Sequence, residues 1–244
     1  MLDNNHEAFS PPKENCTLWR YMDFTKLLSI LESKKILFVR ADKFEDPYEG
    51  SLPKLAVEAI KNPAFNGGIP REHIEMYLEH IKNTPVNFYI NCWFAAEHES
   101  AAMWKLYLQS PEGIAIRSDH DTLCLALERS PLKIRTTKVK YVDYERATIP
   151  IGNIFFPFVH KRMSFSHENE LRAIVWSFED VNKPLIPDDS TLVGVDIDPG
   201  ELIKGIHVSP SAPKWFGELV EQVVRRYGLS CSVEKSNLYD RPSY

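Results

Sequence analysis

A length of 244 residues, with 43% hydrophobic and 26% charged side chains, is that of an ordinary globular protein of one or two domains. The net charge of −5 argues against a nucleic-acid partner, and no apolar run reaches the roughly 18 residues of a membrane-spanning helix. The four cysteines form no C-x-x-C pair and the first fifteen residues lack a signal-peptide pattern, so we expect a reduced, cytoplasmic protein without membrane contact.

Hydrophobic periodicity predicts short strands mixed with helices along the chain. After a flexible N-terminal arm over residues 1–15, we expect a single α+β domain over residues 16–244, with a mixed or antiparallel sheet flanked by helices. Strands are predicted at 17–22, 36–39, 86–94, 113–117, 132–144, 173–176, 192–197, 205–208 and 231–233. Helices are predicted at 25–35, 53–62, 71–83, 97–107, 120–128 and 213–227, and the pair within 53–83 reads as an insertion. We assign no element to residues 149–158.

The stretch 161–176 is the densest in ionisable side chains, and it runs directly into a buried strand. Its charged residues are Lys161, Arg162, His167, Glu168, Glu170 and Arg172. If the chain is already extended at Glu168, then Glu168, Glu170 and Arg172 share one face, because side chains alternate along a strand. Such carboxylates can bind a ribose hydroxyl, a metal or a cation. The alternative is ion pairing with Arg172 or Lys161 on a solvated surface.

Three further regions combine polar and aromatic side chains. Arg20 lies within an apolar strand and is either an anion anchor or part of a strand-end salt bridge. The loop 44–49, with sequence FEDPYE, either lines a pocket or forms a charged surface turn. Ser100, Trp104 and Tyr107 share a helical face that either stacks a planar ring or packs into the core.

Other patterns argue for ordinary structure. Cys92 lies in an apolar run and is interpreted as core packing. The basic strand at 133–140 is expected to be a solvated edge strand. The eight histidines show no metal-ligand spacing, so no metal is predicted, and no common catalytic motif is present.

Several spaced motifs together resemble a widespread bacterial family that carries only a domain-of-unknown-function label. They are LWRYMDFTKLLSILESKKILFVRADKFEDPYEG, then NCWF with E-S-x-x-M-W-x-x-Y, then G-I-A-I, and then K-R-x-S-F-x-H-E-x-E-L-R. The resemblance runs from about Leu18 to the C-terminus and implies a fold more than a function.

A second, weaker resemblance is to ADP-ribosyltransferase-like domains. An Arg on the first strand, a following L-L-x-I-L-E helix and a late E-x-E carry it, although no Ser-Thr-Ser triplet is present and Tyr21 stands where a Gly is common. In that family's logic Arg20 orients NAD, Tyr107 stacks the nicotinamide, and Glu170 stabilises the ribosyl cation. The resemblance implies Glu170, Glu168 and Arg20 as catalytic residues and NAD as substrate. It implies Tyr21, Glu49, Ser100, Trp104, Tyr107, Lys161, His167 and Arg172 as cofactor-binding residues.

Two interpretations therefore remain open. One is an NAD-using ADP-ribosyltransferase-like enzyme or NAD glycohydrolase. The other is a non-catalytic module that recognises a nucleotide or a protein partner, for instance in a bacterial phage-defence or stress-response system. A nuclease is less favoured, because no D…E-x-K pattern is laid out on paired strands.

Overall fold

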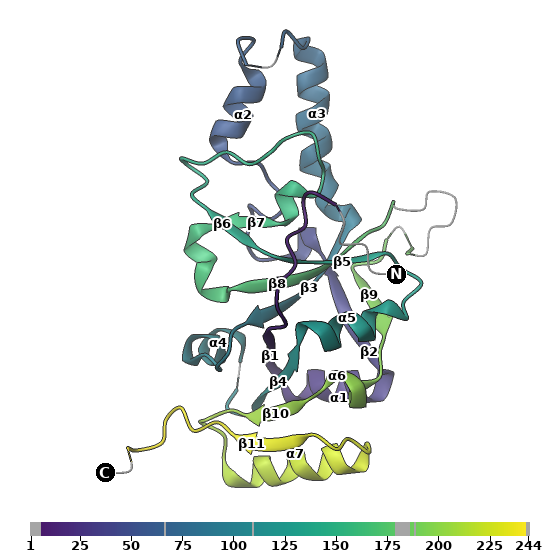
Figure 1. The fold of residues 1–244 in the computed structure, drawn as a ribbon, viewed down its shortest axis with the longest axis vertical. Coiled ribbons are helices and arrows are strands. Elements are labelled where there is room, and N and C mark those ends of the chain that lie inside the picture. The colour runs from purple at the N-terminus through teal and green to yellow at the C-terminus, as the bar shows by residue number, and fades with distance from the viewer. Residues whose placement is uncertain (1–5, 66, 109, 179–185, 188, 243–244) are drawn as a thin grey trace.

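A computed structural model describes residues 6–242 of the chain, apart from 66, 109, 179–185 and 188. A mixed β-sheet with helices packed on it forms one α+β domain, as expected from the sequence (Figure 1). In the part of the chain that is described, no helix has the length and apolar character needed to span a membrane.

The sheet is built from strands far apart in sequence. Its strands are β1 (Thr17–Asp23), β2 (Lys35–Arg40), β3 (Phe88–Ala95), β4 (Gly113–Asp119), β5 (Ile134–Lys138), β8 (Glu170–Trp176), β9 (Leu192–Asp196), β10 (Gly205–Val208) and β11 (Ser232–Lys235). One path through it runs β11-β10-β4-β1-β3-β2-β9, and β8 pairs with both β3 and β5. β10 and β11 are parallel, whereas the other pairs in this sheet are antiparallel. The sheet is therefore mixed, and β8 lies within it rather than at an edge.

Helices α1 (Phe24–Ser33), α5 (His120–Glu128) and α7 (Lys214–Arg226) contribute to the main hydrophobic core through residues such as Leu27, Leu123 and Phe216. The short α6 (Pro199–Leu202) packs beside α5. Asp119 caps α5 by accepting a hydrogen bond from the Thr122 amide at 2.9 Å. The insertion forms helices α2 (Lys54–Lys61) and α3 (Arg71–Asn83), which project from one end of the molecule (Figure 1).

A second core lies on the β3–β8 part of the sheet. It is rich in phenylalanine, and the rings of Phe88 and Phe158 stack at 3.9 Å. Phe9 from the predicted N-terminal arm is buried here, with its ring 5.0 Å from that of Phe155. Residues 1–5 of that arm lie outside the described residues, and its flexibility stays a prediction.

Two expectations about strands are wrong. The region 132–144 is not one strand, because it divides into β5 and β6 (Lys140–Val142), which belong to different sheets. β5 is not solvated either: Arg135, Thr136 and Thr137 are buried. β6 pairs in parallel with β7 (His160–Arg162), a strand too short to show a hydrophobic period, and η3 (Phe156–Phe158) precedes β7 in the unassigned stretch.

Candidate functional site

The charged stretch 161–172 spans three elements rather than one strand. Lys161 lies on β7, Glu168 ends the 3-10 helix η4 (Met163–Glu168), and Glu170 begins β8. Asn169 between the two glutamates has φ 36° and ψ 54°, a left-handed conformation that asparagine tolerates better than most residues. The condition that the chain is already extended at Glu168 is therefore not met, because the chain turns at Asn169.

The carboxylates of Glu168 and Glu170 nevertheless meet at one cation. The Nζ atom of Lys161 donates to Glu168 Oε2 and, at 2.6 Å, to Glu170 Oε1. The Nε atom of Arg172 donates to Glu170 Oε2 at 2.7 Å, so each Glu170 oxygen has a positively charged partner. The alternative of ion pairing with Lys161 and Arg172 is therefore right about the partners, but wrong about a solvated surface, because all four side chains are buried.

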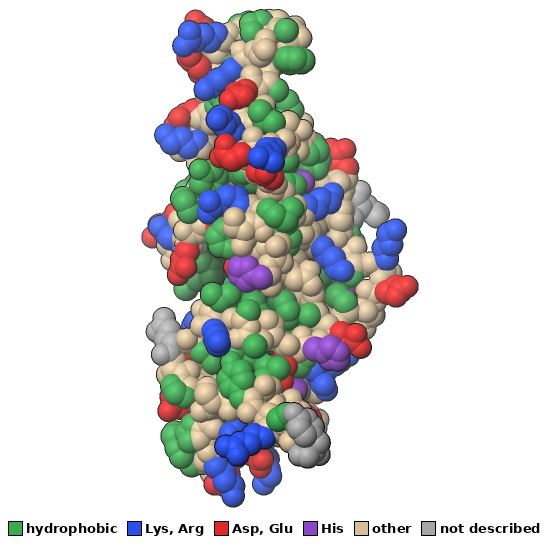
Figure 2. All heavy atoms as spheres, turned by 90° about the vertical axis from the view of Figure 1, so that its left-hand side faces the viewer, with side chains coloured by type: hydrophobic (Ala, Val, Ile, Leu, Met, Phe, Trp, Pro, Cys, Tyr) green, Lys and Arg blue, Asp and Glu red, His purple; other side chains and the backbone are tan. Residues whose placement is uncertain are grey.

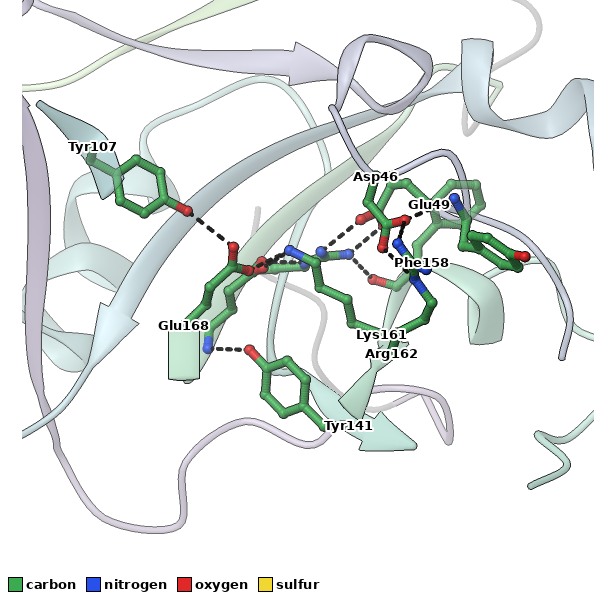
Figure 3. Close-up of polar contacts among 11 residues, drawn as sticks. Asp46, Glu49, Tyr107, Tyr141, Phe158, Lys161, Arg162 and Glu168 are labelled. Carbon is green, nitrogen blue, oxygen red and sulfur yellow. Dashed lines mark hydrogen bonds and ion pairs between the residues drawn. The ribbon is translucent and has the colours of Figure 1, made fainter. Parts of the chain in front are cut away.

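Arg172 connects this cluster to the loop 44–49. Its Nη1 and Nη2 atoms donate to the two oxygens of Glu49 at 2.6 and 2.9 Å, and Nη1 also donates to the Phe158 carbonyl at 2.8 Å. The Arg172 side chain is 0% exposed. A buried guanidinium needs such complete pairing, because an unpaired buried charge is strongly destabilising. We call Glu49, Lys161, Glu168, Glu170 and Arg172 the ion network (Figure 3).

The network contains three carboxylates and two cations, and its protonation reflects that excess. Burial and the neighbouring Glu170 raise the pKa of Glu168 to about 7, although Lys161 opposes this shift. Burial also acts to raise the pKa of Glu170, but Arg172, the hydrogen bond to Glu168 and Lys161 outweigh it and hold that pKa well below its usual range. Two adjacent carboxyls thus differ in charge near neutral pH, an arrangement suited to acid–base chemistry.

Two tyrosines border the carboxyl pair. The Tyr107 hydroxyl donates to Glu168 Oε1 at a long 3.5 Å, and the Tyr141 hydroxyl accepts from the Glu170 amide at 2.9 Å (Figure 3). Tyr107 is 43% exposed, in contrast to the buried carboxyl pair. Sequence analysis missed Tyr141, as well as the ion pair at 2.6 Å between the buried Asp46 and the partly exposed Arg162. The 140–142 alternation is too short to indicate where Tyr141 points.

Arg20 lies where β1 separates from β3. β1 pairs with β3 at Leu18 and Trp19, whereas β2 takes over the same edge of β3 at Ile90 and Tyr89. The Arg20 guanidinium lies 5.8 Å from the Trp93 ring, and its buried Nη1 atom has no hydrogen-bond partner among the described residues. Burial lowers the pKa of Arg20, as expected for a cation without a carboxylate partner.

Cys92 lies on the same face of the sheet as the carboxyl pair, since Cys92 pairs with Arg172 and Phe94 pairs with Glu170 across β3 and β8. Burial and then the charge of Glu170 raise the pKa of Cys92 itself well above its usual range, so this thiol is protonated at neutral pH. A protonated thiol is a poor nucleophile. Arg20 points to the opposite face of the sheet, because Trp19 pairs with Phe94 and Phe94 with Glu170, and side chains alternate along β1.

The remaining candidates have structural partners. The Tyr21 hydroxyl accepts from the Ser100 amide at 2.7 Å, and the Ser100 hydroxyl caps α4 (Ala101–Tyr107) at the Met103 amide. Trp104 is buried edge-on against Tyr21 and donates to Glu99 at 2.7 Å. These residues fasten α4 to β1. His167 is exposed on η4.

A cavity of about 480 Å³ is lined by the loop 44–49 and by the insertion. Phe44, Asp46 and Glu49 line it, together with Leu78 and Ile81 of α3. The loop does border a pocket, but Asp46 and Glu49 already bind Arg162 and Arg172. Among the described residues, no group of three or more His, Cys, Asp or Glu side chains is placed to hold a metal ion.

The surface seen in Figure 2 carries Lys, Arg, Asp and Glu side chains interspersed with hydrophobic ones. Neither sign of charge forms a continuous stripe on this face. This face therefore shows no continuous positive patch of the kind that binds nucleic-acid phosphates.

No protein-family model matches the chain, so the resemblance to a bacterial domain of unknown function stays a prediction. No curated protein matches its sequence. The fold is distantly similar to that of DarT from Thermus sp. 2.9 in complex with NAD+, with a TM-score of 0.42 and 8% identity over 93% of this chain and 98% of that one. A structure of the same DarT with carba-NAD+ gives a TM-score of 0.37 and 9% identity, over 92% of this chain and 97% of that one. Likenesses this weak decide nothing about the function of this chain.

Proposed function

We propose that the protein consumes NAD+ as an ADP-ribosyltransferase or NAD glycohydrolase. One observation carries the proposal: the carboxyls of Glu168 and Glu170 meet at the Nζ atom of Lys161, beside the exposed Tyr107. NAD+ presents a diphosphate, two riboses and a cationic nicotinamide ring, so it needs an anion partner, a ribose partner and an aromatic face. We assign the ribose to Glu170 and the aromatic face to Tyr107. Arg20, the anion partner that the resemblance implies, points to the face of the sheet opposite to that of Glu170.

The chemistry assigned to these residues is a displacement at C1′ of the nicotinamide riboside. The C1′–N bond breaks, its electron pair stays with the departing neutral nicotinamide, and positive charge develops on the ribosyl group. The Glu170 carboxylate stabilises that charge. The oxygen of water or of an acceptor hydroxyl then bonds to C1′, and its proton passes to Glu168 when that group is ionised. A pKa of about 7 suits Glu168 to accept a proton near neutral pH.

The engagement of Glu170 by Lys161 and Arg172 leaves room for this role. Each oxygen accepts one bond from those cations, at 2.6 and 2.7 Å. A carboxylate offers about four lone-pair sites. Besides Lys161 and Arg172, the Glu168 carboxyl and the Cys92 thiol hydrogen-bond to Glu170, so a ribose hydroxyl would replace one of the latter two. Lys161 and Arg172 would then fix the carboxylate rather than block it.

The test is release of nicotinamide from NAD+ by purified wild type and by Glu170→Gln, in parallel with melting temperatures. The matched control is Glu221→Gln, which removes an exposed carboxylate on α7 that pairs with Arg225. We expect wild type and Glu221→Gln to release nicotinamide at equal rates and Glu170→Gln to lose about 100-fold or more. Undiminished release by a folded Glu170→Gln would exclude that residue as the catalytic carboxylate.

A non-catalytic nucleotide- or protein-binding module is the second candidate. Complete pairing of Glu49, Glu170 and Arg172 within the protein is what a purely structural network would show. Such a module shifts its melting temperature with a ligand but does not consume it. Stabilisation by NAD+ without nicotinamide release would favour this candidate over the enzyme.

A further inference from the structure

We infer that Tyr141 is a positioning residue for Glu170, an inference that rests on the catalytic role proposed for that carboxylate. Tyr141 lies on β6, outside the sheet that contains Glu170. Its hydroxyl oxygen accepts the Glu170 amide proton at 2.9 Å. The contact bridges the two sheets of the molecule at the residue that carries the proposed chemistry (Figure 3).

The two-stranded sheet presents a matched pair of side chains to Glu170. β6 and β7 pair in parallel with Tyr141 opposite Lys161, so both side chains point to the same face. Lys161 binds the Glu170 carboxylate at Oε1, and Tyr141 binds the Glu170 backbone. One register pair therefore holds both ends of a single residue, which fixes the carboxylate relative to its own main chain.

The position of Glu170 in the chain explains why its amide donates to the Tyr141 hydroxyl. Glu170 is the first residue of β8 and follows the left-handed turn at Asn169. The backbone hydrogen bonds that β8 makes at this point use carbonyl groups and not the Glu170 amide. The Ala95 amide donates to the Asn169 carbonyl, and the Val139 amide donates to the Glu170 carbonyl. A buried amide that loses its acceptor pulls its backbone toward another one, and Glu170 is buried. Catalytic groups lose rate steeply when misplaced by about 1 Å.

The test compares Tyr141→Phe with Tyr144→Phe, which removes a phenol of the same region. The Tyr144 hydroxyl donates weakly to the Ser51 carbonyl at 3.5 Å and touches neither Glu168 nor Glu170. The first readout is hydrogen exchange of the Glu170 amide by NMR, which requires no substrate. We expect about tenfold faster exchange at Glu170 in Tyr141→Phe, no change at the Ile174 amide on the same strand, and wild-type exchange in Tyr144→Phe.

The second readout is the kinetics of nicotinamide release. In Tyr141→Phe we expect kcat to fall about tenfold with KM unchanged, because the phenol contacts the Glu170 backbone rather than substrate. Wild-type exchange at Glu170, or faster exchange with an unaltered kcat, would overturn the inference. If wild type releases no nicotinamide, the proposed function fails, whereas the exchange experiment still decides whether Tyr141 anchors Glu170.

Discussion

The aromatic cluster under α4 consists of Trp19, Tyr21, Phe94 and Trp104. It lies next to the ion network on the sheet, but the polar groups of the two regions are paired differently. Phe94, which is paired with Glu170 across β3 and β8, belongs to the aromatic cluster. There the polar groups of Trp19, Tyr21 and Trp104 each make one hydrogen bond, at 2.7 to 2.9 Å. The network instead holds an excess carboxylate, and the pKa of Glu168 moves to about 7. The paired polar groups of the aromatic cluster stabilise the fold. The excess carboxylate of the ion network leaves Glu168 able to gain or lose a proton near neutral pH.

The largest test of this contrast removes the central cation. Arg172→Met leaves the buried Glu49 carboxylate without a cation and Glu170 with Lys161 alone. We expect the free energy of unfolding, measured with urea, to fall by roughly 3–5 kcal/mol. The control Arg225→Met breaks an exposed pair on α7 and should cost less than about 1 kcal/mol. Equal losses in the two variants would contradict the importance of the buried network.

A change in the aromatic cluster should be intermediate. Tyr21→Phe keeps the ring against Trp104 but removes the acceptor of the Ser100 amide. We expect a loss of about 1–3 kcal/mol in unfolding free energy, because that amide is left without its partner. Nicotinamide release should stay at the wild-type rate. A stable variant that has lost NAD+ turnover would instead place Tyr21 in contact with substrate.

The free energy of unfolding should depend on pH through Glu168 of the ion network. The unfolded chain loses the Glu168 proton near its ordinary pKa of 4.5, whereas the folded protein keeps it until about 7. Between these values the folded state binds more protons, so stability falls as pH rises, by at most about 1.4 kcal/mol per pH unit.

Glutamine cannot ionise, so Glu168→Gln removes this contribution. The unfolding free energy of wild type minus that of the variant should decline from about pH 4.5 to about pH 7 and be flat above. A difference that is constant or rising over this window would show that Glu168 is ionised throughout.

The smallest effect on the free energy of unfolding is expected for Tyr107, which borders the carboxyl pair. Tyr107→Phe removes a hydroxyl that meets Glu168 at 3.5 Å, too long for a strong bond. We expect less than about 0.5 kcal/mol in unfolding free energy. The control Tyr227→Phe removes another exposed tyrosine contact, at 2.8 Å to Glu32. Tyr107→Ala, which also removes the ring, should weaken NAD+ affinity by roughly 1–3 kcal/mol in titration calorimetry.

Hydrophobic periodicity in the sequence predicts most helices and strands, but not the turns and short strands that connect them. The helices at 71–83 and 120–128 were predicted with the ends that the structure shows, and the buried strand at 173–176 extends back to Glu170. The left-handed turn at Asn169 and the three-residue strand β7 carry no periodic signal. Both depend on tertiary contacts, such as the pairing of β6 with β7, which single-sequence patterns do not encode.

The candidate site shows the same division. Lys161, Glu168, Glu170 and Arg172 stand out in the sequence because they lie beside a buried strand, and Glu49 because it belongs to the polar and aromatic loop 44–49. The five side chains do lie together. Tyr141 and the pair of Asp46 with Arg162 were missed, since 116 residues separate Asp46 from Arg162. The roles proposed for Arg20 and Glu170 in catalysis stay predictions.

The position of β8 in the chain has a consequence for synthesis on the ribosome. β8 supplies Glu170 and Arg172 and joins β3 to β5, although β3 is made some eighty residues earlier. A nascent chain or a fragment that ends before β8 holds the Glu49 carboxylate without Arg172, and leaves an edge of β3 without its partner strand. Such intermediates expose unpaired backbone that is prone to aggregation. The network therefore assembles late, and in vivo yield should depend on how quickly residues 170–176 follow the first half of the sheet.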